Sequence, residues 1–158
     1  MANAYITALK ESLEKKISVL EEIRAKDEEQ LSLIKQSPFP TDAFDKNAEE
    51  KGVLIYKLNK LDDGFELVYE KVSEELKNNR AAYSDDIRNM QELITKITDL
   101  STAIQAEEAR NKAALENYFA GERSKLKTQR SQLNASRAYS QAMMKGRNTY
   151  NGIVSERK

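Results

Sequence analysis

Four polar residues interrupt apolar stripes and are the side chains best placed to do chemistry: Asp27, Lys51, Glu108 and Asn111. Each stands where the spacing of large apolar residues predicts another apolar side chain. A lysine between carboxylates in a cleft can transfer protons. The alternative is a buried polar layer, which fixes the register of packed helices at a cost in stability. We favour the layer and expect no enzyme, because no nucleophile or substrate pocket accompanies these residues.

Composition excludes several further chemistries. The 158 residues contain no histidine and no cysteine, which removes disulfides, thiolate zinc sites, cysteine nucleophiles and the Ser-His-Asp triad. Di-iron bundles need histidine as well. The five glycines are isolated, so no glycine-rich phosphate loop exists. We therefore expect no metal and no cofactor.

The scarcity of turn residues predicts an all-α fold. Only five glycines and two prolines occur, and both prolines fall at 37–42, where they separate one helix from the next. A weaker break at 78–84 ends in Ser84, a good N-cap before two aspartates. These breaks predict helices over about 3–36, about 42–78 and from Ser84 onward. We expect an elongated antiparallel bundle of three helices, the first two of about 35 residues.

The register of such a bundle brings the four polar residues into one layer. In antiparallel neighbours the facing residue numbers have a nearly constant sum. The first turn then places Asp27 beside Lys51, and the second places Lys51 near Lys112, close to Glu108 and Asn111.

The third helix is predicted to be much longer than the others. A partner for the first two helices needs residues only to about 120, and Gly121 lies there. Residues 1–120 hold 17 basic and 24 acidic residues, whereas residues 121–158 hold 9 basic and 2 acidic. The second part is also too poor in apolar residues to bury a core alone. We therefore divide the chain into a bundle (1–120) and a basic amphipathic C-terminal segment (121–158) that protrudes or is mobile.

A narrow apolar seam runs through the C-terminal segment. It comprises Phe119, Leu126, Leu133, Tyr139, Met143, Met144 and Tyr150. We favour a partner-binding function, in which the seam lies in a groove of another protein. The alternatives are a fourth helix that folds back on the bundle, or a frayed end. Nucleic-acid binding is disfavoured because the rest of the chain is acidic, and the helix lacks the dense apolar face of a membrane-surface helix. The N-terminus has no signal-peptide pattern, which favours a cytoplasmic protein.

The chain resembles the flagellar export chaperones of the FlgN type. The resemblance spans most of the sequence and lies in the leucine-patterned first helix Leu9–Ile34, the stretch Ala48–Lys51, Asn111-Lys112 ahead of Leu115–Phe119, and the C-terminal run from Arg130 to Tyr150. It implies a small, cytoplasmic, helical protein without enzyme activity.

The same resemblance implies a partner. Such chaperones bind the C-terminal helical segments of the hook-associated proteins, prevent their early self-association and deliver them to the flagellar type III export apparatus, with an export-gate component as a further partner. The corresponding client-binding residues here are Leu126, Leu133, Tyr139, Met143, Met144 and Tyr150. The alternative is a structural coiled coil or stalk-like secretion component that forms homodimers through its C-terminal seam.

Overall fold

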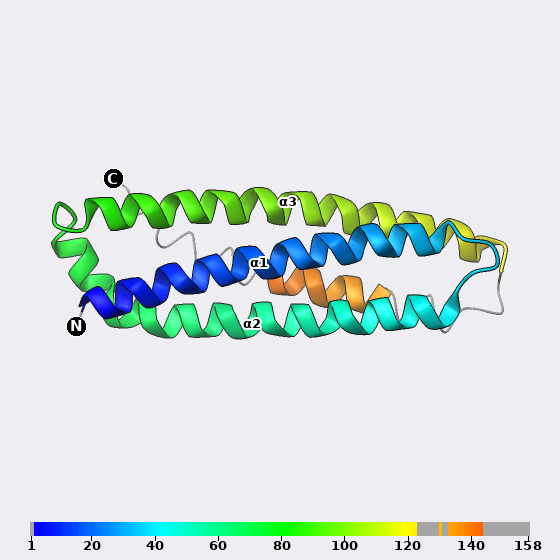
Figure 1. Ribbon diagram of the computed structural model, residues 1–158, viewed down its shortest axis with the longest axis horizontal. Coiled ribbons are helices and arrows are strands. Elements are labelled where there is room, and N and C mark those ends of the chain that lie inside the picture. The colour runs from blue at the N-terminus through cyan, green and yellow to red at the C-terminus, as the bar shows by residue number, and fades with distance from the viewer. Residues whose placement is uncertain (1, 123–129, 131–132, 144–158) are drawn as a thin grey trace.

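The computed structural model describes residues 2–122, 130 and 133–143 (Figure 1). This part of the chain is all-helical. It contains α1 (Ala2–Ile34), α2 (Thr41–Asn78), α3 (Ser84–Ala120) and a helical segment at 133–143. None of the helices that the structure describes combines the length and apolar character that a membrane span requires.

Local sequence sets the helix ends. The chain turns at Pro38–Pro40, and α2 begins with Phe44 donating its backbone N–H to the Pro40 carbonyl at 2.9 Å. At the other end the N–H of Asn79 donates to the Glu75 carbonyl at 3.0 Å. Two aspartates follow in the first turn of α3, where the partial positive charge of the helix N-terminus favours them. The predicted breaks at 37–42 and 78–84 are thus confirmed.

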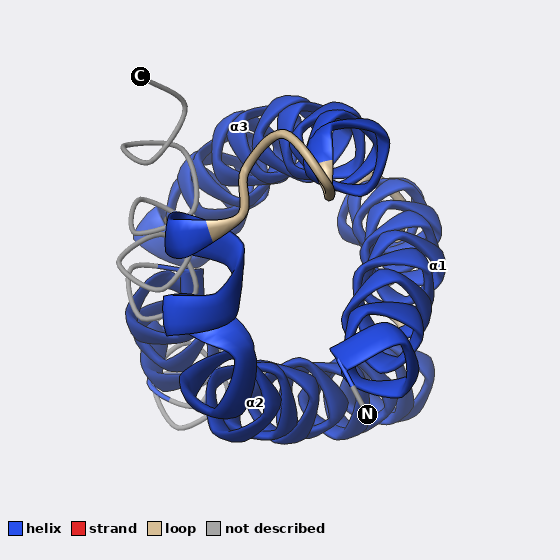
Figure 2. Ribbon diagram, turned by 90° about the vertical axis from the view of Figure 1, so that its left-hand side faces the viewer, coloured by secondary structure: helices blue, strands red, loops and turns tan. Residues whose placement is uncertain are grey.

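The two other long helices, α2 and α3, lie against α1. The backbone of this helix lies close to those of both α2 and α3, whereas the backbones of α2 and α3 do not approach each other closely in the described residues and meet through side chains such as Lys51 and Glu108. Segment 133–143 lies on the remaining side, opposite α1 and between α2 and α3 (Figures 1 and 2). Tyr139, Ala142 and Met143 join the same core cluster as the three helices. The middle of the bundle therefore has four helical sides.

The sequence predicted a third helix much longer than the other two. In the structure, α3 has a similar length instead. It has 37 residues, against 33 in α1 and 38 in α2. It ends at Gly121, and the N–H of Glu122 donates to the Phe119 carbonyl at 3.0 Å. The prediction of a protruding tail is also wrong for segment 133–143. Its apolar side chains are covered by the bundle, because three helices left one side of the core open.

An aromatic cluster closes the end of the bundle near the prolines. Phe39 from the first turn stacks on Tyr118 with ring centroids 4.7 Å apart and lies 5.2 Å from Phe44. Phe119 is buried in this cluster, 5.8 Å from Phe39. The last turn of α3 is therefore anchored to the turn between α1 and α2.

Candidate functional site

The structure brings Asp27, Lys51, Glu108 and Asn111 together in the middle of the bundle. The Lys51 ammonium lies 2.7 and 2.9 Å from the two carboxylate oxygens of Glu108 and 3.4 Å from Oδ1 of Asp27. Lys51 and Asp27 are fully buried, and Glu108 is nearly so. One lysine from α2 thus connects a carboxyl group of α1 with one of α3.

Amide side chains extend this layer toward the proline turn. The Asn111 amide donates to the backbone carbonyl of Asp27 at 2.8 Å and to Gln30 Oε1 at 3.2 Å. Gln30 donates to Asn47 at 3.2 Å, and Asn47 donates to the Lys26 carbonyl at 3.0 Å. Each helix therefore holds the others at one axial position, as expected of a layer that fixes register.

Charge balance in the layer requires a bound proton. Burial raises the pKa of Asp27 to about 9, the nearby Glu108 carboxylate adds to the rise, and the Lys51 ammonium opposes it. Oδ2 of Asp27 is buried without a hydrogen-bond partner. A proton on Asp27 makes it a donor toward Glu108 and leaves one cation beside one anion. Asp27 is therefore neutral at pH 7, and the layer carries no net charge.

The layer links the three long helices through buried side chains. Asp27, Lys51 and Asn111 have no exposed surface. Within the described residues no group of three histidine, cysteine, aspartate or glutamate side chains could hold a metal ion. Buried among the helices and bonded to one another, these side chains hold α1, α2 and α3 at one axial position.

Tyr139 covers the layer from the fourth side. Its side chain has 0% exposure, and its hydroxyl is buried without a hydrogen-bond partner. Burial raises the pKa of Tyr139 far above its usual range, and the nearby Asp27 and Glu108 carboxyl groups add to the effect. The hydroxyl is thus a neutral group that is buried near the layer without a hydrogen-bond partner.

The predicted partner-binding residues have different positions. Tyr139 and Met143 are buried in the bundle of their own chain, and Leu133 is half-buried at the start of the segment. Phe119 is buried in the aromatic end cluster, which corrects its assignment to an exposed seam. Leu126, Met144 and Tyr150 lie outside the described residues.

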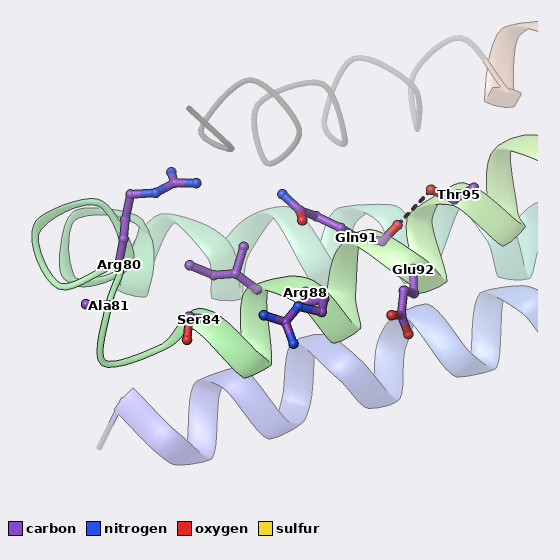
Figure 3. A pocket seen from close by; sticks show the side chains of 8 residues that line it. Arg80, Ala81, Ser84, Arg88, Gln91, Glu92 and Thr95 are labelled. Atoms are coloured by element: carbon purple, nitrogen blue, oxygen red, sulfur yellow. Dashed lines mark hydrogen bonds between the residues drawn. The ribbon is translucent and has the colours of Figure 1, made fainter.

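Two hollows border the side of the bundle between α2 and α3. One of about 410 Å³ lies between α3 and segment 133–143, with Glu108, Lys112 and Tyr139 in its lining. The other, of about 610 Å³, lies at the turn between α2 and α3 (Figure 3). Arg80 from the turn and Arg88 from α3 both line it. The packing along this side is therefore incomplete at two points.

Sequence reasoning missed a second buried ion pair. The Lys16 ammonium lies 2.8 Å from Asp62 Oδ1, and both side chains are nearly fully buried. Burial lowers the pKa of Lys16, and Asp62 opposes that shift. Both residues occupy core-facing positions of their helices, and the pairing sum that places Asp27 near Lys51 also places Lys16 near Asp62. The signal was therefore present in the sequence.

Comparisons of the chain with family models, curated proteins and solved structures return no match.

Proposed function

We propose that this protein is a chaperone that binds a helix of another protein on the side of the bundle between α2 and α3. The observation that carries the proposal is that the backbones of these two helices lie close to α1 but not to each other. A gap of that kind accepts one amphipathic helix, and segment 133–143 of the same chain lies there. A client helix would take the place of this segment.

Weak packing of segment 133–143 supports the exchange. Only two large side chains, Tyr139 and Met143, are fully buried from it. They contribute about 3–6 kcal/mol before the cost of ordering the segment is subtracted. The Ser136 and Tyr139 hydroxyls are buried without hydrogen-bond partners, which lowers the net gain further. A client with better-matched side chains can therefore compete.

The two arginines at the far hollow suit one end of a client helix. Segment 133–143 runs from the proline end toward the turn between α2 and α3 (Figure 1). A client that follows the same direction brings its C-terminal end toward Arg80 and Arg88. Helix C-termini carry partial negative charge and, at a chain end, a carboxylate, which arginine binds well.

The resemblance to the FlgN type supplies the cellular setting of the proposal. The clients are the C-terminal helices of flagellar hook-associated proteins, bound in the cytoplasm and passed to the type III export apparatus. Binding hides an apolar stripe that would otherwise self-associate. No cofactor and no catalytic step enter this function.

A peptide-binding experiment with the full chain tests the proposal. The probe is a fluorescent peptide of a hook-associated protein's C-terminal helix, and anisotropy measures its affinity. In the double variant Tyr139→Ala/Met143→Ala the competing segment is weakened, so the affinity rises by roughly tenfold. Lys57→Ala, at an exposed position of α2 outside the core, is the control and leaves the affinity unchanged. Loss of binding in the double variant would instead mean that the C-terminal segment itself binds the client peptide.

A further inference from the structure

The outer face of α2, away from the core, carries an unpartnered apolar strip. Among the described residues, the three large hydrophobic side chains that are mostly exposed are Val53, Tyr56 and Leu67, with 56%, 61% and 63% exposure. All three lie on α2. Exposed hydrophobic residues that are scattered singly over a surface need no explanation. A group of them on one helix face indicates a contact surface.

These residues belong to a seven-residue repeat, which we call the outer seam. It comprises Lys46, Val53, Lys60, Leu67 and Glu74, all exposed. A repeat of seven keeps one line of side chains facing a second helix along its length. Tyr56 lies beside the seam and borders an apolar hollow of about 400 Å³ between α1 and α2. Val53 borders another of about 360 Å³.

The outer seam is complementary to itself when reversed. In an antiparallel pair of α2 helices centred on Lys60, Lys46 faces the partner's Glu74 and Val53 faces the partner's Leu67. Each of these pairs occurs twice around the two-fold axis. A parallel pair would set Lys46 against Lys46 and Glu74 against Glu74, so charge selects the antiparallel arrangement.

Two details of α2 remove the obstacles to this pairing. Lys60 would meet its own copy at the axis, but its ammonium lies over the Tyr56 ring, 5.3 Å from the ring centre, and so leaves the seam. Glu50, which the same register brings toward Glu70 of a second copy, is held by Lys26 at 3.1 Å.

Gly64 supplies an independent observation. Glycine in the middle of a helix weakens it, and nothing in this structure lies within 4 Å of the position that a Gly64 Cβ would occupy. Packing within the chain therefore does not require glycine there. Gly64 lies between Lys60 and Leu67 on the outward face, where it leaves room for a large side chain of a closely approaching helix.

We propose that the outer seam of α2 is the interface of an antiparallel homodimer, in which two copies of this chain pack α2 against α2. The interface is separate from the side between α2 and α3, so it leaves that side open. The dimer thus presents two copies of the candidate client-binding side.

Sedimentation of the full chain over a range of concentrations tests the dimer. The wild-type chain shows a reversible monomer–dimer equilibrium, and Leu67→Lys raises the dissociation constant at least about tenfold. Lys46→Glu and Glu74→Lys each weaken the dimer, because each sets like charges together twice. Mixing the two variants restores association as a heterodimer, since both pairs between positions 46 and 74 then join opposite charges.

A matched pair of glycine variants separates the interface from helix stability. Gly64→Leu and Gly52→Leu both replace an exposed glycine within α2 that has open space around it. Both raise the melting temperature, but only Gly64→Leu weakens the dimer. A wild-type chain that stays monomeric, or mixed charge variants that fail to associate, would overturn the proposal. Equal dimerisation of the two glycine variants would do so as well.

Discussion

The trunk formed by α1, α2 and α3 and the segment 133–143 bury side chains to the same extent but hold them differently. Phe65 in α2 and Tyr139 in the segment are both almost fully buried. Phe65 belongs to a helix of 38 residues with ten buried positions, whereas the described segment buries three side chains. Burial of one residue therefore says little about how firmly its element is held.

Polar groups sharpen the same contrast. In the trunk, the Lys51 ammonium and the Asn111 amide each have two partners. In the segment, the buried Ser136 and Tyr139 hydroxyls have none. A buried polar group costs free energy unless it is paired. Unpaired atoms occur in the trunk as well, at Asp27 Oδ2 and Gln91 Nε2, but the trunk also has many paired buried groups, whereas both buried hydroxyls of the described segment are unpaired.

The largest effect should come from breaking the trunk layer. Lys51→Leu leaves the Glu108 carboxylate buried without its cation and lowers the free energy of unfolding by about 3–5 kcal/mol at pH 7. Urea unfolding followed by circular dichroism measures it, with the exposed Lys57→Leu as a control of small effect. A loss below about 1 kcal/mol would mean that the layer does not stabilise the trunk.

A matched truncation of two buried rings compares the regions directly. Phe65→Ala lowers the free energy of unfolding by about 3–5 kcal/mol. Tyr139→Ala lowers it by less than about 2 kcal/mol, because the segment can detach and the loss cannot exceed its docking free energy. Hydrogen exchange then shows lost protection at 133–143 only. Equal losses in the two variants would make the segment a full fourth helix of the trunk.

Most of the trunk could be predicted from sequence, because it depends on short-range signals. Apolar spacing and the two breaks predicted three helices. The pairing sums predicted that Asp27, Lys51, Glu108 and Asn111 would meet, and the structure brings them together.

The place of the C-terminal segment could not be predicted in the same way. Apolar spacing gives the face of a helix but not which surface covers it. Tyr139 and Met143 suit a client's groove and their own bundle equally well. The gap between α2 and α3 is a tertiary feature without a local signal, so the length argument wrongly predicted that residues 133–143 protrude.

A smaller effect concerns the proton on Asp27. Its folded-state pKa of about 9 exceeds the ordinary value of 3.8, so between these limits the folded chain holds a proton that the unfolded chain releases. The free energy of unfolding of the wild type therefore falls as pH rises through this window. An asparagine at position 27 resembles the protonated aspartic acid and does not titrate. The free energy of unfolding of Asp27→Asn therefore does not fall in this way as pH rises.

Urea unfolding of both chains at acid and alkaline pH measures the difference. Asp27→Asn gains stability relative to the wild type between about pH 5 and about pH 8. If the wild type gained instead, Asp27 would be ionised and the layer would carry a net negative charge.

The smallest effect isolates the unpaired hydroxyl of the segment. Tyr139→Phe keeps the buried ring and removes a hydroxyl that has no partner, so docking of the segment improves by roughly 0.5–1 kcal/mol. Protection of 133–143 against hydrogen exchange rises, and a competing client peptide binds a few-fold more weakly. Tyr83→Phe, at a hydroxyl that donates to Glu75 at 3.1 Å on the exposed surface, is the control and changes neither quantity. Weaker protection in Tyr139→Phe would mean that the hydroxyl is satisfied in solution, and the segment would then be held as firmly as the trunk.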